Sequence, residues 1–260
     1  WIEPLAEVYP LSKTRVKAIN YLSTVTAPKN AETDYPHISL AEKRKPRVFI
    51  PILPGTNSED DLIHPFREAG SEIDTLVFRN YDNTALTESR QSLIEHLNKA
   101  QILVFPGAAH GLAKAVFSHP MIAEAVNLWL EIGQNLILGT GNGFSELLQL
   151  GLLPEGTIIH TGPGNPTLAT NIRGGFIGST VSTRYMNASS PWLNLLIPDQ
   201  IDRIPIAGEK GRLVASIETF SNLMDNGLIA FCYADPEGEP TSKEHWNPTG
   251  STMGIEGVIN

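Results

Sequence analysis

Residues 135–144 read NLILGTGNGF, an apolar run that leads into a turn built almost wholly of small residues. The run at 135–138 predicts a buried strand, and the apolar period that continues to Leu150 predicts a helix closed by Gly151. A sharp strand-to-helix turn of this kind has the shape of a nucleophile elbow, which holds a Ser or Cys above a parallel sheet at the start of a helix. The stretch therefore predicts an α/β protein with its site at this turn.

The residues before this turn show the same alternation of strand and helix. The first helix is expected to end at Glu68, and its start at Ser58, with Asp61 three residues later, approximates a capping box. The alternation predicts a parallel sheet flanked by helices, with right-handed crossovers. The expected strands are residues 48–53, 74–79, 102–105 and 135–138, and the later helices are 87–99, 121–132 and 144–150.

The regular alternation of strands and helices begins at Arg47 and ends at Gly151. Strands at 158–159, 176–186, 204–206 and 228–233, with one helix at 216–224, predict mixed or antiparallel strands beside the parallel core. Residues 1–46 are rich in proline after a short expected helix at 12–25, and we interpret them as an N-terminal appendage and linker. The main domain is expected at residues 47–260.

Composition excludes several classes of protein. The net charge is −9 and no broad basic face is visible, so nucleic acid is not an expected partner. The single cysteine, Cys232, allows neither an intrachain disulfide nor a Cys-rich zinc site, and no apolar run reaches the roughly 18 residues that a membrane span needs. We expect a cytoplasmic protein without cofactor or metal. Because the chain begins at Trp1 and stops at Asn260 inside an apolar run, we also expect a fragment or a processed piece.

The turn at residues 139–143 carries no side chain that could attack a substrate at its apex. The nucleophile position is Gly141, within Gly139-Thr140-Gly141-Asn142-Gly143. The spacing is G-x-G-x-G, which does not match the dinucleotide-binding G-x-G-x-x-G, although the loop could bind a small anion weakly. A second strand end, Gly107-Ala108-Ala109-His110, is expected at the same edge of the sheet.

Other reactive side chains form no complete catalytic set. Cys232 lies in an apolar strand, where a buried thiol is expected. His110 is the one histidine in a plausible pocket. His64, His96, His119 and His245 show no acidic partner at ligand spacing, so we interpret them as surface or packing residues.

A series of short motifs, in order, resembles one family. The motifs are VFIP and PGTN within residues 48–57, EIDTLVFRN at 72–80, NGF at 142–144, LGLLP at 150–154, SPWL at 190–193, GRLVA at 211–215, NPTGS at 247–251 and GIEG at 254–257. They resemble the glutaminase domain of phosphoribosylformylglycinamidine synthase, a class I glutamine amidotransferase, and the resemblance implies the flavodoxin-like fold of that class. The resemblance implies a cysteine thiolate nucleophile, a His base oriented by a Glu, and delivery of ammonia to an ATP-dependent synthetase.

The departures from the family pattern lie at the positions that carry the catalytic chemistry. Gly141 stands where the family has the nucleophilic cysteine, and Ser145 stands where it has a glutamine. Residues 107–110 replace the loop that shapes the oxyanion hole, and GEKGR at 208–212 replaces a His-Gly-Glu-Gly-Arg stretch. The catalytic His and Glu are expected shortly after Gly257, in a segment that this chain does not reach.

Three hypotheses follow from these departures. The first is a degenerate, non-hydrolysing domain (a pseudoenzyme) that acts as a structural or docking module for the synthetase domain or subunit of this ligase in purine biosynthesis. The second is a working part of the synthase, which uses ammonia from solution or an unrecognised nucleophile such as Thr140 or Ser145. The third is a sensor that holds a small anion in the emptied pocket near Gly107 and Gly141.

Overall fold

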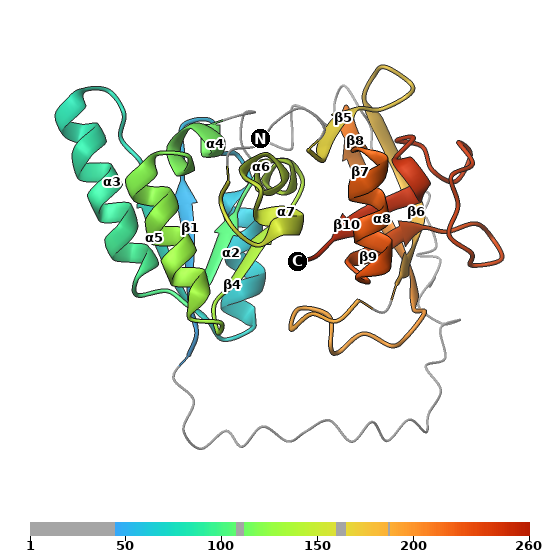
Figure 1. Cartoon of the computed structure of the whole chain (residues 1–260), viewed down its shortest axis with the longest axis horizontal. Helices are drawn as coiled ribbons and strands as arrows, with labels where there is room; N and C mark the ends of the chain where they lie inside the picture. Colours follow the sequence, from blue (N-terminus) through green and yellow to red (C-terminus); the bar gives the residue numbers. More distant parts are fainter. Residues whose placement is uncertain (1–44, 108–111, 160–164, 187) are drawn as a thin grey trace, which may run out of the picture. The chain divides into compact units, whose positions relative to one another are not determined.

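The structure is a computed structural model that describes residues 45–107, 112–159, 165–186 and 188–260 (Figure 1). These residues belong to one compact unit. The helix expected at residues 12–25, and Ala108, Ala109 and His110, lie outside the described residues. The division into an appendage at 1–46 and a domain at 47–260 stays a prediction.

A four-stranded parallel sheet forms the first half of the unit, as predicted. Its strands are β1 (Arg47–Ile52), β2 (Glu72–Val77), β3 (Ile102–Phe105) and β4 (Leu136–Gly139), in the order β2-β1-β3-β4. The helices are α2 (Glu59–Glu68), α3 (Asn83–Leu97), α4 (Leu112–Phe117), α5 (Pro120–Glu131), α6 (Asn142–Leu150) and α7 (Leu152–Glu155). The short helix α4 was not predicted, because its LAKAVF sequence is too short to show a helical period.

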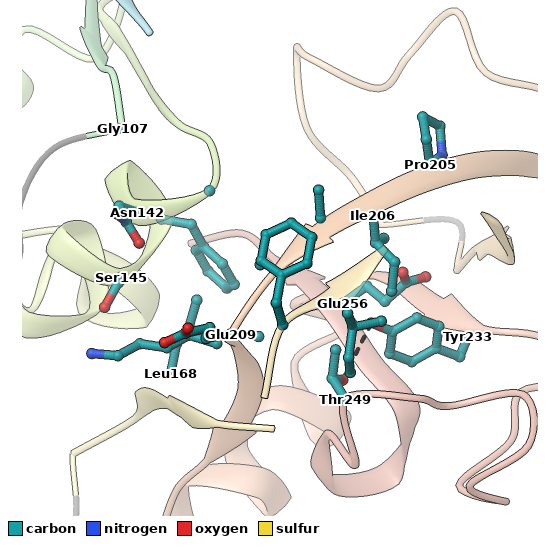
Figure 2. Close-up of a pocket in the computed structure, with 18 of the residues that line it drawn as sticks. Gly107, Asn142, Ser145, Leu168, Pro205, Ile206, Glu209, Tyr233, Thr249 and Glu256 are labelled. Carbon is teal, nitrogen blue, oxygen red and sulfur yellow. Dashed lines mark hydrogen bonds between the residues drawn. The ribbon is translucent and has the colours of Figure 1, made fainter. Parts of the chain in front are cut away.

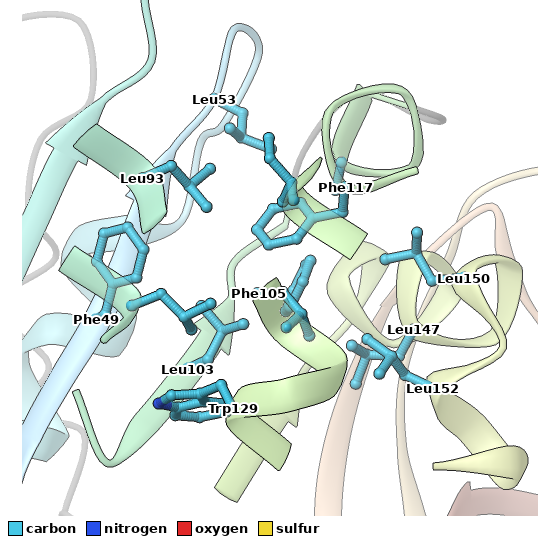
Figure 3. Close-up of a cluster of buried hydrophobic side chains, with 14 of the residues drawn as sticks. Phe49, Leu53, Leu93, Leu103, Phe105, Phe117, Trp129, Leu147, Leu150 and Leu152 are labelled. Atoms are coloured by element: carbon cyan, nitrogen blue, oxygen red, sulfur yellow. The ribbon is translucent and has the colours of Figure 1, made fainter. Parts of the chain in front are cut away.

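Alternate side chains of this sheet pack on opposite faces, because successive residues of a strand point to opposite sides. Phe49 and Phe105 lie on one face and pack with Trp129 of α5 (Figure 3). Val48 and Val104 lie on the other face, in a second cluster that includes side chains of α2. Burial of each such side chain contributes about 1.5–3 kcal/mol, which holds helices on both faces of the sheet.

Antiparallel strands form the second half of the unit, as expected, but in sheets of their own. β6 (Ile177–Tyr185), β7 (Ile201–Gly208), β9 (Ile229–Tyr233) and β10 (Ile255–Val258) make a sheet in the order β10-β9-β6-β7. β5 (Thr167–Thr170) pairs with β8 (Lys210–Val214), and α8 (Ile217–Asp225) and a 3-10 turn, η3 (Thr252–Gly254), complete this half.

Two details of the sequence-based prediction were wrong here. Ile158 and Ile159 form no strand, and the Ile159 amide instead donates to the carbonyl of Leu150 at 3.0 Å. The strands β5, β8 and β10 were not predicted, because each is four or five residues long and β8 and β10 contain glycine.

The helix that follows the elbow turn is packed against both halves of the unit. Leu147 and Leu150 of α6 belong to the core of the parallel sheet. Leu148, on the same helix, packs with Leu213 of β8 and Leu223 of α8. The start of α6 is therefore held from two sides, which fixes where the turn points.

Ser58 does not make the capping box that the sequence suggests. Its side chain accepts no hydrogen bond from α2 and instead accepts one from the Gly107 amide at 2.7 Å. The Asn57 amide donates in turn to the Gly107 carbonyl at 3.1 Å. These two bonds tie the loop after β1 to the loop after β3, at the carboxyl edge of the sheet.

No described helix is both long enough and apolar enough to cross a membrane.

Candidate functional site

The elbow turn is present, with glycine at its apex. Gly141 lies between β4 and α6 with φ 54° and ψ −119°, a conformation that residues with a side chain rarely adopt. A Cβ atom added to Gly141 would meet no atom of the described residues within 4 Å. The described part of the chain therefore leaves room for a side chain at the apex, and the backbone conformation of Gly141 is what opposes one.

The neighbouring glycines differ from Gly141, because packing requires them. A Cβ on Gly143 would overlap the carbonyl oxygen of Phe105, and a Cβ on Gly139 would come within 2.7 Å of both the Gly143 carbonyl oxygen and the Leu147 side chain. These two contacts let α6 start close against β3 and β4. The close packing that shapes the elbow is thus intact around an apex that carries no reactive group.

A cavity of about 730 Å³ opens beside the apex (Figure 2). Gly107, Gly141 and Asn142 line its elbow side, so the structure brings together the two strand ends that the sequence singled out. Gly139, Thr140 and Gly143 do not line it. The rest of the described lining comes mainly from the second half of the unit: Leu168, Phe176, Ile177, Pro205, Ile206, Ala207, Gly208, Glu209, Lys210, Gly211, Tyr233, Thr249 and Glu256.

The two hydroxyl groups next to the apex differ in access. Ser145 lines the cavity but is only 2% exposed, and its Oγ accepts a hydrogen bond from Gln149 Nε2 at 3.2 Å. Thr140 is exposed and lies outside the described lining of the cavity. A hydroxyl nucleophile needs an adjacent base to activate it, and the hydrogen bond at the Ser145 hydroxyl is to an amide group, which is not a base.

Cys232 is a buried strand thiol, as predicted. It lies on β9 with 3% of its surface exposed and does not line the cavity. Burial raises the pKa of its thiol to about 12, and the charge of Glu256 adds to the shift. Because the thiolate is the reactive form, Cys232 is inert near neutral pH.

The histidines of the described chain lie away from the cavity. His64, His96, His119 and His245 are all absent from its lining. The expectation that they have no acidic partner at ligand spacing was wrong for His64, and His96 has an acidic partner that is distant in the sequence. His96 Nδ1 lies 2.9 Å from Asp74 Oδ1, and His64 Nε2 lies 3.5 Å from Glu68 Oε1. The first pair joins α3 to β2, which spacing along the sequence could not show.

The far side of the cavity carries polar residues that sequence reasoning missed. Tyr233, Thr249 and Glu256 lie together opposite the elbow (Figure 2), and Thr249 Oγ1 donates to Tyr233 Oη at 3.2 Å. Burial raises the pKa of Glu256 to about 7, although the hydroxyl of Thr183 opposes the shift. The signal in the sequence was a glutamate inside the short apolar stretch 255–258.

The described residues offer no metal site, since no three His, Cys, Asp or Glu side chains among them lie close enough to share an ion. The parallel sheet, the elbow turn and the cavity at the carboxyl edge together form the architecture of the class I glutamine amidotransferases. Residues 45–260 match the CobB/CobQ-like glutamine amidotransferase domain family, and the chain belongs to that family.

Relatives of this chain carry one recurring name. It is 28% identical over 213 residues to the "Phosphoribosylformylglycinamidine synthase subunit PurQ" of Aquifex aeolicus (strain VF5), covering 80% of this chain and 82% of that protein. It is 30% identical over 210 residues to the protein of the same name from Methanocaldococcus jannaschii, covering 79% of each. The solved structure described as "Structure of PurLQS from Thermotoga maritima" has the same fold, with a TM-score of 0.56 and 24% identity over 84% of this chain and 82% of that chain.

Proposed function

We propose that this chain is a glutaminase-like subunit or domain that has lost the covalent step, and that it acts as a structural or docking module for the ATP-dependent synthetase of phosphoribosylformylglycinamidine synthase. The observation that carries the proposal is Gly141, which has the conformation of the elbow apex and no side chain. The names of the relatives, each a subunit of that synthase, supply the proposed pathway and partner.

The missing side chain removes a specific chemical step. In a glutaminase of this class, a thiolate at the apex attacks the carboxamide carbon of glutamine, a C–S bond forms, and the C–N bond breaks to release ammonia. Gly141 has no atom that can form this bond. Removing one member of a catalytic set that acts as a unit lowers the rate by about four to six orders of magnitude.

The packing around the turn supports a role that needs the fold and not the reaction. Within the turn, Gly139 and Gly143 are the two positions at which a Cβ atom would collide with neighbouring atoms, and this chain has kept glycine at both. The indole of Trp192 donates a hydrogen bond of 3.2 Å to the carbonyl of Ile137 in the edge strand β4. A chain under no constraint would lose such contacts as readily as it loses a nucleophile.

The experiment measures glutamate release from glutamine by the chain alone and by the chain mixed with the synthetase subunit. We expect no release above the blank in either sample, together with a stable complex in sedimentation velocity. Gly141→Ala is the matched control for Gly141→Cys, since both add a Cβ at the same strained position. Release by the unmodified chain would disprove the loss of the covalent step, and failure to form a complex would disprove the docking role.

Release by Gly141→Cys but not by Gly141→Ala would have a separate meaning. It would show that the thiol was the one missing part and that the base is supplied from elsewhere in the complex. Release by neither variant is expected here, because no described histidine lines the cavity.

A working glutaminase is the second candidate, and Ser145 is the observation that favours it. Ser145 is a hydroxyl group in the lining of the cavity, one turn of helix after the apex. If it were the nucleophile, the unmodified chain would release glutamate and Ser145→Ala would not. The small-anion sensor is less favoured, because the described lining of the cavity contains two carboxylates, Glu209 and Glu256, and one cation, Lys210.

A further inference from the structure

The cavity contains a carboxylate that the proposed function does not use. Glu256 lies on β10, and its Oε2 atom is buried without a hydrogen-bond partner among the described residues. No described Lys, Arg or His forms an ion pair with it. The hydroxyl of Thr183 is the nearby group that interacts with this carboxyl group, but the two form no hydrogen bond of normal geometry. Glu256 is therefore a carboxyl group in the wall of a cavity whose Oε2 atom has no well-formed hydrogen bond from the described residues.

A buried carboxylate without donors is unfavourable for folding. Water is lost on burial, and no protein hydrogen bond replaces it at Oε2. The group relieves this in one of two ways: it takes up a proton, or it accepts hydrogen bonds from a ligand with N–H groups. Burial raises the pKa of Glu256 to about 7 for the same reason, since it removes water from the charged form. At and above neutral pH the second way is the one that stabilises the ionised form.

The surroundings of Glu256 define the ligand further. Apolar side chains line the same cavity, among them Phe144, Leu168, Phe176 and Ile206. Ile206 and Tyr233 lie beside Glu256 in Figure 2, on the side opposite the elbow. Phe176 is 70% exposed, so the cavity opens to solvent at an aromatic ring. A ring or chain of apolar atoms would displace water from these surfaces when it entered.

The charges of the lining favour a cation. Among its described residues, Glu209 and Glu256 can each carry a negative charge and Lys210 carries one positive charge. The lining has no described arginine, and the guanidinium of Arg184 is engaged by Asp199 at 2.9 Å and Glu239 at 3.2 Å. An incoming carboxylate would meet two like charges, whereas an ammonium group would meet two opposite ones.

We propose that this cavity binds a small organic amine on the side opposite the elbow. The ammonium group of the amine pairs with Glu256, and its apolar body packs on Phe176 and Ile206. The site uses neither Gly141 nor glutamine hydrolysis, so it stands or fails independently of the proposed function. It turns the emptied elbow pocket into a receptor for an amine.

The test compares three probes of similar shape and different charge: phenethylamine, phenethyl alcohol and hydrocinnamate. Binding of each to the full chain is measured by calorimetry at pH 8. We expect the amine to bind at least about tenfold more tightly than the alcohol, since hydrogen bonds to charged groups are stronger than neutral ones, and the carboxylate to bind most weakly. Glu256→Gln keeps the shape of the side chain and removes its charge, so it should weaken the amine about tenfold and leave the alcohol unchanged.

Controls separate a specific site from general effects of charge. Glu95→Gln removes an exposed charge on α3 and should leave the amine's affinity unchanged. Glu209→Gln, at the opposite side of the cavity, should weaken the amine by less than Glu256→Gln does. If Glu256→Gln does not fold, methyl NMR of the unmodified chain keeps the proposal testable, because the Ile206 and Leu168 signals should shift with the amine and not with the carboxylate.

Several outcomes would overturn the proposal. Equal affinity for the three probes would mean that the cavity senses only apolar surface. An amine affinity unchanged in Glu256→Gln would place the amine elsewhere, and a carboxylate that binds more tightly than the amine would reverse the expected charge preference. Absence of measurable amine binding, with no methyl shifts, would leave the cavity without this ligand.

Discussion

The backbone amide of Gly107 donates a 2.7 Å hydrogen bond to the hydroxyl of Ser58, across 49 residues of sequence. The bond connects the loops that follow β1 and β3, the two central strands of the parallel sheet. Asn57 and Gly107, one from each loop, both contribute to the lining of the cavity. One side chain outside the elbow thus holds together the two loops that frame the pocket.

Ser58→Ala should lower the free energy of unfolding by about 1–3 kcal/mol, because it leaves the part-buried Gly107 amide without its acceptor. The helix content should not change, since Ser58 makes no side-chain cap on α2. Urea unfolding followed by circular dichroism measures both. Ser118→Ala, at an exposed serine, is the control. It should change the free energy of unfolding by less than about 0.5 kcal/mol, as is usual for surface substitutions. Equal losses in the two variants would contradict the assignment.

Gly143→Ala and Gly141→Ala should destabilise the fold for different reasons. At Gly143 the new methyl group would overlap the Phe105 carbonyl, and overpacking of this kind costs about 1–3 kcal/mol or more. At Gly141 the methyl group meets no described atom within 4 Å, and its cost is that of the backbone conformation, φ 54° and ψ −119°, at about 1–3 kcal/mol. Thermal unfolding should therefore rank Gly143→Ala as the more damaging.

Gly70→Ala calibrates the conformational part of this comparison. Gly70 has φ +86°, and a Cβ built on it also meets no described atom within 4 Å. Its substitution should cost about 1–2 kcal/mol, the cost of a left-handed φ for a residue that carries a side chain. A loss at Gly141 that equals the loss at Gly143 would show that the apex is sterically closed.

Glu256→Gln should change the dependence of stability on pH. Burial raises the folded pKa of Glu256 from the ordinary 4.5 to about 7, so the folded chain holds the proton more tightly than the unfolded chain. Its contribution to stability is complete below pH 4.5 and is lost as the pH rises through 7. The loss of stability amounts to at most about 3 kcal/mol. Because glutamine cannot ionise, the variant does not lose this stability.

The variant should therefore gain stability relative to the unmodified chain between pH 4.5 and 8, with little difference at the acid end. Urea unfolding at a series of pH values measures this difference. Thr183 on β6 and Cys232 and Tyr233 on β9 are the neighbouring groups that interact with the Glu256 carboxyl group. Burial also raises the pKa of Cys232 and Tyr233, to about 12, so neither titrates in this range. A difference that does not vary with pH would refute the shift.

The parallel half of the fold could be predicted from the sequence because each strand and helix there corresponds to a local pattern of apolar residues. The run at 102–105 coincides with β3, and the glycines after α6 and before it lie where the turn residues were expected. The far wall of the cavity was not readable in this way. Glu256 and Glu209 approach the elbow only through the packing of α6 against the second half, and the short strands β8 and β10 carry no distinctive period.

The same reason explains the smaller errors. Ser58 was predicted to cap a helix because the local pattern fits a cap, but its hydroxyl instead accepts a hydrogen bond from the Gly107 amide, 49 residues away along the chain. His96 looked unpaired because Asp74 lies on a neighbouring strand and not at a nearby position along the chain. Local patterns define elements, whereas side-chain partners depend on which elements meet.

Trp192→Phe should weaken the attachment of the second half to the edge strand β4. The substitution removes the indole N–H that donates to the Ile137 carbonyl at 3.2 Å, while it keeps an aromatic ring near Phe66. The expected loss is about 1 kcal/mol in the free energy of unfolding, typical of one hydrogen bond. Trp246→Phe, at an indole that is 37% exposed, is the control for general effects of the change. Faster hydrogen exchange at β4 in Trp192→Phe alone would support the assignment, and equal exchange in both variants would contradict it.

A cysteine placed at the apex should react quite differently from the native one. The Cβ atom of Gly141→Cys would meet no described atom within 4 Å, and its thiol would lie at the start of α6, where the helix dipole lowers the pKa of a thiol. Cys232 is buried with its pKa raised to about 12. Iodoacetamide at pH 7.5 should therefore label the new cysteine at least on the order of a hundredfold faster than Cys232, as the difference in thiolate fraction and access requires.

Mass spectrometry of peptic fragments distinguishes the two sites, and the unmodified chain reports the rate for Cys232 alone. Cys232→Ser combined with Gly141→Cys isolates the apex. Labelling of the apex as slow as that of Cys232 would mean that the turn is closed to solvent and that a thiol there would not be ionised. The vacancy at Gly141 would then have left no usable pocket for a nucleophile. Fast labelling would instead mean that the apex remains open, with the missing side chain as the local defect.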